Sequence, residues 1–132
     1  MARKRYPPTD PREWLNRARS NLVRASNVAA GVYLEDLCFD GQQAAEKAIK
    51  AVFIHRSQPF PYTHNLKDLL DRLECCGVKV PKYVFKAQEL TRFAVVARCP
   101  EAAGPVSKRE YRQLLRIAER VVRWAERQIA KP

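Results

Sequence analysis

The stretch from Cys38 to Leu70, CFDGQQAAEKAIKAVFIHRSQPFPYTHNLKDLL, decides the fold of this chain. Its first half repeats small or apolar residues at steps of three and four, which is the spacing of one face of an α-helix. Because several of these residues are glycine or alanine, the backbone of a neighbouring helix can approach closely. We therefore predict a central helix with other helices around it. The residues that carry the pattern are Leu34, Leu37, Cys38, Gly41, Ala45, Ala48, Ile49 and Val52.

The second half of this stretch places the chain's two histidines on either side of one loop. His55 and Arg56 precede the loop, which two prolines keep out of helix, and His64 follows it. A neutral imidazole there could act as a general base on a ribose hydroxyl, and an arginine could stabilise charge that develops on the phosphate. His55, Arg56 and Arg98 are the candidates to complete such a site, or to bind phosphate without catalysis. The alternative interpretation is that His64 only orders the corner between loop and helix.

Capping signals and hydrophobic periodicity predict helices along the rest of the chain. The segments DPRE (10–13) and SKRE (107–110) each place a glutamate three residues after an N-cap residue. No strand pattern occurs, so the expected fold is all-α: an antiparallel up-and-down bundle of four long helices plus a shorter fifth helix. The expected helices run from Pro11 to about Gly31, Leu34 to about Ser57, Leu66 to Gly77, Pro81 to about Ala97, and Lys108 to about Ile129.

The positive charge of the chain is concentrated at its two ends. The net charge of the 132 residues is +11; residues 1–24 hold seven Lys or Arg against two acidic residues, and residues 107–132 hold eight against three. The ends of an antiparallel bundle are often neighbours, so one basic surface for an anionic partner is expected. We interpret residues 1–9 as a flexible basic arm and residues 10–132 as a single helical domain.

The last predicted helix carries arginines at steps of three or four. At 100° per residue these arginines fall within about 80° of the helix circumference, and apolar residues lie opposite. Such a row suits the phosphates of a nucleotide or RNA, with Arg112, Arg116, Arg120 and Arg123 as its centre. A solvated helix face is the competing interpretation. The full row is Arg109, Arg112, Arg116, Arg120, Arg123 and Arg127.

Other classes of site are absent from the sequence. The four cysteines lack the paired short spacings of a zinc site, and no paired histidines at helical spacing suggest another metal. The four glycines are isolated, which excludes a P-loop and a dinucleotide-binding fingerprint. We expect no metal and no cofactor. No apolar run is long enough to cross a bilayer and no secretory signal is evident, so a cytoplasmic protein is expected.

Three segments of the chain together resemble the HEPN domain family of prokaryotic helical proteins. They are CFDGQQAAEKAIKA (38–51), THNLKDLL (63–70) and FAVVARCP (93–100), and the resemblance extends from Asp10 to about Ile129. It implies a small helical bundle that is often dimeric and often encoded with a minimal nucleotidyltransferase. Some HEPN families are metal-independent RNases whose arginine and histidine lie four to six residues apart. This chain departs from that motif, because seven residues separate Arg56 from His64 and no histidine follows Arg98.

Two main hypotheses follow for function. The first is a non-enzymatic HEPN-like protein that binds nucleotide or RNA phosphates, as a homodimer and as the partner or substrate-binding subunit of a minimal nucleotidyltransferase in a toxin–antitoxin-like module. The alternative is a metal-independent RNase that uses His64 with Arg56 or Arg98. A scaffold that only dimerises is a third possibility.

Overall fold

The computed structural model describes residues 3–131, and every regular element in them is helical. The all-α prediction is therefore confirmed. The elements in chain order are α1 (Pro11–Ala25), α2 (Leu34–His55), α3 (Leu66–Cys75), α4 (Lys82–Phe85), the 3₁₀-helix η1 (Lys86–Val95) and α5 (Lys108–Ala130).

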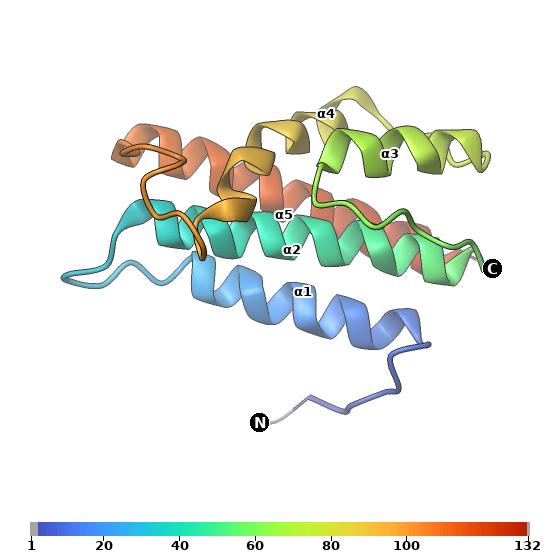
Figure 1. The fold of residues 1–132 in the computed structure, drawn as a ribbon. Helices are drawn as coiled ribbons and strands as arrows, with labels where there is room; N and C mark the ends of the chain where they lie inside the picture. The colour runs from blue at the N-terminus through green and yellow to red at the C-terminus, as the bar shows by residue number, and fades with distance from the viewer. Residues whose placement is uncertain (1–2, 132) are drawn as a thin grey trace.

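Helix α2 is the centre of the molecule, and α1, η1, α3 and α5 pack around it. Figure 1 shows α1, α2, the α4–η1 segment and α5 alternating in direction, as in an up-and-down bundle. The loop between α2 and α3 runs back along α2, because Phe60 packs against Phe53 and His64 contacts Glu46. For this reason α3 points the same way as α2.

The small residues of α2 permit close packing against α5, as the sequence pattern predicts. A Cβ added at Gly41 would lie 3.7 Å from the Cβ of Ala118 in α5. Ala44, Ala45 and Ala48 have no exposed surface. Larger side chains of the core come both from α2, which contributes Ile49 and Phe53, and from the surrounding elements, among them Phe93 of η1 and Trp124 of α5.

Helix α1 ends six residues before the predicted end at Gly31. The hydroxyl of Tyr111 in α5 donates a hydrogen bond to the Ala25 carbonyl, which in a longer helix would bond within the helix. Residues 26–31, which the prediction assigns to this helix, lie instead in an exposed loop. A contact from the far end of the chain thus replaces the next helical turn.

The fourth predicted helix is mostly a 3₁₀-helix rather than an α-helix. Only Lys82–Phe85 is α-helical, and the next ten residues form η1. The buried residues step by three, which matches the three residues per turn of a 3₁₀-helix. An α-helical pattern places Ala94 and Ala97 on this face, whereas Phe93 and Val96 occupy it. The buried series is Val84, Ala87, Leu90, Phe93 and Val96.

The basic segment before α1 lies along that helix. The Asn16 side chain donates to the carbonyl of Lys4 at 2.8 Å, and the Tyr6 amide donates to Glu13 Oε1 at 3.0 Å. The Trp14 indole donates to the carbonyl of Pro8 at 2.7 Å. Residues 3–8 therefore have a defined course beside α1, while the flexibility of the arm stays a prediction; Met1 and Ala2 lie outside the described residues.

Candidate functional site

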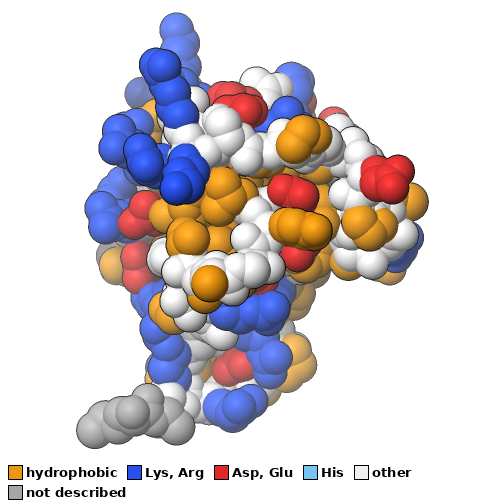
Figure 2. Space-filling view, turned by 90° about the vertical axis from the view of Figure 1, so that its left-hand side faces the viewer, with side chains coloured by type: hydrophobic (Ala, Val, Ile, Leu, Met, Phe, Trp, Pro, Cys, Tyr) orange, Lys and Arg blue, Asp and Glu red, His pale blue; other side chains and the backbone are white. Residues whose placement is uncertain are grey.

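The arginine row of α5 lies on the surface, with the core on the opposite face of the helix. Ser107 and Glu110 form the capping box that the sequence predicts, and this sets the start of the helix. Arg112, Arg116 and Arg123 are all exposed, whereas Leu114, Ala118, Val122 and Ala125 are buried. Figure 2, which views the end of the molecule where α5 begins, shows Lys and Arg side chains gathered along the edge formed by α5.

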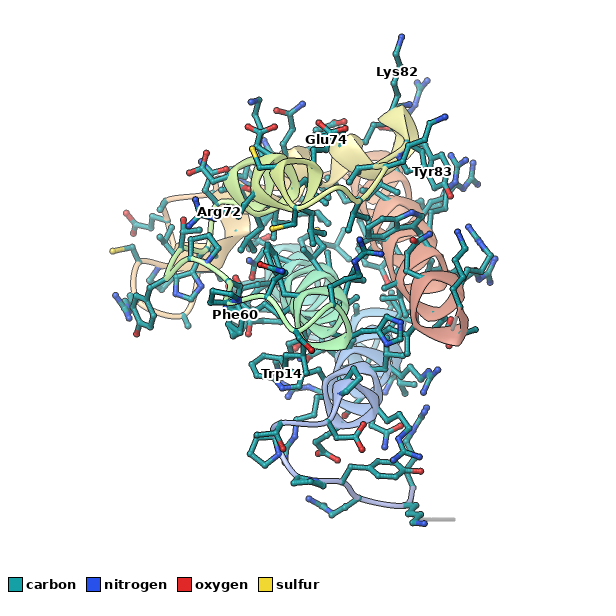
Figure 3. The ribbon with its side chains drawn as sticks, turned by 90° about the vertical axis from the view of Figure 1, so that its right-hand side faces the viewer. Trp14, Phe60, Arg72, Glu74, Lys82 and Tyr83 are labelled. Atoms are coloured by element: carbon teal, nitrogen blue, oxygen red, sulfur yellow. The ribbon has the colours of Figure 1, made fainter. Side chains whose placement is uncertain are left out.

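Tyr83 of α4 holds two of these arginines in place. The Arg120 guanidinium lies over the Tyr83 ring, with Cζ 4.4 Å from the ring centroid. Arg127 donates from Nη2 to the Tyr83 hydroxyl at 2.9 Å. Figure 3 shows Tyr83 beside α5. Part of the row is therefore an ordered basic surface built from two elements, because stacking and a hydrogen bond restrict side chains that would otherwise move freely in solvent.

A shallow hollow of about 380 Å³ lies where this surface meets the α4–η1 segment. Lys86 joins Arg116 and Arg120 around it, against the single carboxylate of Glu89. Three cations facing one carboxylate favour an anionic ligand. The excess of cations fits the phosphates of a ligand, and contacts to phosphates carry no sequence information.

His64 is joined to a buried carboxylate and not to an arginine. Its Nδ1 lies 2.9 Å from Oε1 of Glu46, which also accepts a hydrogen bond from Gln42 at 2.9 Å. Lys50 donates to Oε2 of the same carboxylate at 3.0 Å. The His64 side chain is 58% exposed and that of Glu46 only 6%, so the imidazole reaches the surface from a buried anchor.

The partners of Glu46 keep its carboxyl group ionised. Burial opposes the charge, but hydrogen bonds from His64, Lys50 and Gln42 outweigh this effect and hold the pKa of Glu46 below its ordinary value of 4.5. A fixed negative charge therefore lies behind the imidazole and orients it.

His55 and Arg56 lie far from His64 along α2. Because the loop doubles back, His64 sits beside Glu46, and Arg56 follows Glu46 by ten residues, a rise of about 15 Å. A Cβ added at Gly77, just beyond α3, would come within 4.0 Å of the Arg56 guanidinium. His55 Nε2 lies 3.1 Å from the carbonyl of Lys131 at the end of α5. The loop therefore separates the pair that the catalytic hypothesis needs.

Arg98 is exposed in the loop that follows η1. The next part of this loop, residues 100–105, lies against the start of α2 at Tyr33, Glu35 and Asp36. Glu46 and its partner His64 are about three turns further along α2. No hydrogen bond or ion pair among residues 3–131 joins Arg98 to His64.

Several residues of these sites escape sequence reasoning. Tyr83 and Lys86 contribute to the α5 surface, but Tyr83 lies in α4 and Lys86 is the first residue of η1. The 3₁₀ period of η1 differs from that of the α-helix that the sequence predicts there. The sequence does indicate an ion pair between Glu46 and Lys50, since the two residues lie four apart on one helix. Its bond to His64 depends on the course of the loop, which the sequence does not specify.

The cysteines take no part in these sites. Cys38 is buried, and burial raises the pKa of its thiol to about 12, whereas Cys75 and Cys99 are exposed. Cys76 is half-buried, so only Cys38 of the four cysteines belongs to the core. Across residues 3–131, no three His, Cys, Asp or Glu side chains come together as a metal site would require. None of the helices in that part of the chain is both long and apolar enough to span a membrane.

Comparisons with known proteins agree on the kind of fold. Residues 11–128 match the sequence profile of the HEPN domain. The crystal structure of TT1696 from Thermus thermophilus superposes with a TM-score of 0.77 at 32% identity, over 89% of this chain and 97% of that one. ST0689, an archaeal HEPN homologue, superposes with a TM-score of 0.73 at 25% identity, over 91% and 98%. None of the curated proteins matches the chain significantly.

Proposed function

The chain belongs to the HEPN domain family, and from this premise we propose that it is a non-enzymatic member that binds the phosphates of RNA or nucleotides through α5. The observation that supports the proposal is the ordered arginine surface around Tyr83. Arg120 stacks on its ring and Arg127 bonds its hydroxyl, so two cations are presented at fixed positions next to the hollow. An ordered cation loses less side-chain entropy on binding a phosphate than a free one does.

The phosphate contacts expected here are independent of base sequence. Arg112, Arg116, Arg120 and Arg123 are exposed on one helix, so a single-stranded backbone that runs along α5 can reach several of them at once. The test is the affinity for a single-stranded RNA as a function of salt, in the wild type and after replacement of these four arginines by glutamine.

We propose further that the chain acts as a homodimer and as the partner of a minimal nucleotidyltransferase, in a cytoplasmic toxin–antitoxin-like pair. The support is family membership together with a basic surface that could hold the anionic substrate of such an enzyme. The test is to co-express the chain with a nucleotidyltransferase encoded beside its gene. Co-elution in a complex of defined stoichiometry is expected. If the two proteins elute separately at micromolar concentration, or no such gene is adjacent, the partnership is wrong.

A metal-independent RNase is the second candidate function, and one observation favours it. The buried Glu46 carboxylate orients the exposed imidazole of His64, as a carboxylate does for a histidine that acts as a general base. The observation against it is the position of Arg56, beyond the other end of α3. We therefore rank phosphate binding first.

A further inference from the structure

A second basic hollow, separate from the α5 surface, lies between the N-terminal segment, α1 and α2. Its volume is about 570 Å³, within the range of roughly 300–1,000 Å³ that holds small-molecule ligands. Three segments of the chain contribute cations to it. They are Arg3, Lys4 and Arg5 from the N-terminal segment, Arg17 and Arg24 from α1, and Lys47 from α2.

The carboxylates near this hollow do not balance its six cations. Glu13 is the single acidic residue in the lining, and it already accepts hydrogen bonds from the Tyr6 amide and from Arg17 at 2.8 Å. Asp40 lies behind the lining and is 6% exposed; it accepts a hydrogen bond from Asn21 and forms an ion pair with Arg24 at 3.5 Å, so two carboxylates face the six cations. The cations therefore leave excess positive charge that an anion in the hollow would neutralise.

Lys47 marks the buried side of the hollow. Its ammonium group donates to Asn21 Oδ1 at 2.7 Å, which aims it between α1 and α2. Burial, followed by the neighbouring charge of Arg17, lowers the pKa of Lys47, and together with Arg24 these effects outweigh the opposing charges of Glu46 and Asp40. Cations have thus been brought together at a cost in free energy, which a bound anion would offset.

The N-terminal segment forms one wall of the hollow, and hydrogen bonds to α1 fix the course of its backbone. Asn16 binds the carbonyl of Lys4, and Glu13 binds the amide of Tyr6, so the backbone that carries Arg3, Lys4 and Arg5 is held at two points. Both contacts use backbone atoms of the segment. The side chains of Arg3 and Arg5 therefore remain available to a ligand, and the Lys4 ammonium lies 5.5 Å from the centroid of the Tyr6 ring.

We propose that this hollow binds the phosphate chain of a compact polyphosphate, either inorganic or as part of a nucleoside triphosphate. A chain of linked phosphates presents several negative charges within a few ångströms, so it can meet cations from all three segments at once. An RNA backbone carries one charge per nucleotide, so it fits an extended surface such as α5 better than a concave hollow. The site goes beyond the proposed α5 function and does not depend on it.

Calorimetric titration of the full chain with inorganic tripolyphosphate, ATP and AMP tests this proposal. Two variants remove charge from the hollow: Arg17→Gln with Arg24→Gln, and Arg3→Gln with Lys4→Gln and Arg5→Gln. The second keeps the backbone contacts of the segment, so it remains informative if the first fails to fold. The control is Arg72→Gln with Lys79→Gln, exposed residues that remove the same charge as the first variant. Arg72 lies on α3, on the other side of α2 from α1 (Figure 3).

Tripolyphosphate and ATP should bind the wild type and the control alike, and AMP more weakly. Each hollow variant should lose roughly tenfold or more in affinity for tripolyphosphate, because one charge-assisted contact is worth at least one power of ten. Equal affinity for ATP and tripolyphosphate would identify the phosphate chain alone as the ligand, and tighter binding of ATP would identify a nucleotide.

Three results would overturn the proposal: no tripolyphosphate binding by the wild type at millimolar concentration, an equal loss in the control, or loss of RNA affinity in the hollow variants with tripolyphosphate affinity unchanged. The last would make the hollow part of an RNA surface. Tripolyphosphate binding without RNA binding would instead refute the proposed α5 function alone.

Discussion

The imidazole of His64 lies 2.9 Å from the buried carboxylate of Glu46, although the two residues are separated by the end of α2 and a loop that doubles back along it. Gln42 and Lys50 complete the hydrogen bonds of this carboxylate. Glu46 therefore joins the loop to the central helix, and it sets the position of an exposed group that resembles a catalytic base.

Replacing Glu46 by glutamine should lower the free energy of unfolding and make it depend less on pH in the acidic range. The loss at neutral pH should be about 1–3 kcal/mol, because Lys50 and His64 lose a charged acceptor. The pKa of Glu46 is lowered in the folded state, so its contribution is present above pH 4.5 and is lost as the pH falls further, through the folded-state pKa. The free energy of unfolding of the wild type should fall more steeply in that window than that of Glu46→Gln, as measured by urea denaturation.

The matched control for this measurement is Glu74→Gln on α3, an exposed carboxylate. It should change the free energy of unfolding by less than about 0.5 kcal/mol. If the free energy of unfolding falls equally with decreasing pH in the wild type and in Glu46→Gln, the ionised carboxylate does not stabilise the fold.

The chain should not cleave single-stranded RNA above background in EDTA. His64 is tied to Glu46, Arg56 lies beside Gly77, and Arg98 lies in the loop that packs on the start of α2. The assay compares the wild type with His64→Ala and Arg98→Ala. Cleavage that either substitution abolishes would promote the RNase hypothesis over phosphate binding.

Replacement by alanine should raise the stability of the protein at Gly41 and lower it at Gly31. A Cβ at Gly41 would be in ordinary contact with Ala118 at 3.7 Å, so Gly41→Ala should stabilise the helix by about 0.5–1 kcal/mol. Gly41→Leu should cost about 1–3 kcal/mol through overpacking. Gly31 has a φ of +84°, so Gly31→Ala should destabilise although its surroundings are open. Thermal unfolding followed by circular dichroism measures all three, and a destabilised Gly41→Ala would refute the packing described here.

The protein should be a dimer in solution through a surface that includes Tyr62 and Val95. Tyr62 is fully exposed, Val95 is 44% exposed, and Phe39 lies two turns before Glu46 on the same side of α2. Such apolar groups are usually covered by a partner. Light scattering at micromolar concentration should give the mass of two chains, and Tyr62→Asp with Val95→Asp should give one. Tyr33→Asp, in the loop before α2, is the control that should stay dimeric, and a monomeric wild type would contradict the prediction.

The presence and the starts of α1, α2, α3 and α5 could be predicted from local signals, and the site residues in part. The Ser107–Glu110 capping box and the small residues around Gly41 act through neighbours in the same segment or through general packing rules, so they are visible in the sequence. The arginine row of α5 is visible for the same reason.

The features that could not be predicted depend on contacts between distant segments. Tyr111 ends α1 by bonding Ala25, and the return of the loop after α2 brings His64 to Glu46 instead of Arg56. The position of Tyr83 beneath Arg120 needs the packing of α4 on α5. Each of these depends on the tertiary arrangement, so periodicity and capping do not report it.

The dependence of RNA affinity on salt tests the central proposal most directly. For the wild type, the affinity for a single-stranded 20-mer should fall steeply between roughly 50 and 200 mM salt, because each phosphate contact releases counterions. In the variant with Arg112, Arg116, Arg120 and Arg123 replaced by glutamine, affinity at low salt should fall by roughly tenfold or more, and the slope of log K against log salt should decrease by about 0.7 for each phosphate that is no longer neutralised. The pair Arg116→Gln and Arg120→Gln should show part of this effect, and Arg72→Gln with Lys79→Gln should show little. Unchanged affinity and slope in the four-arginine variant would mean that the α5 surface is only solvated and would contradict the proposed function.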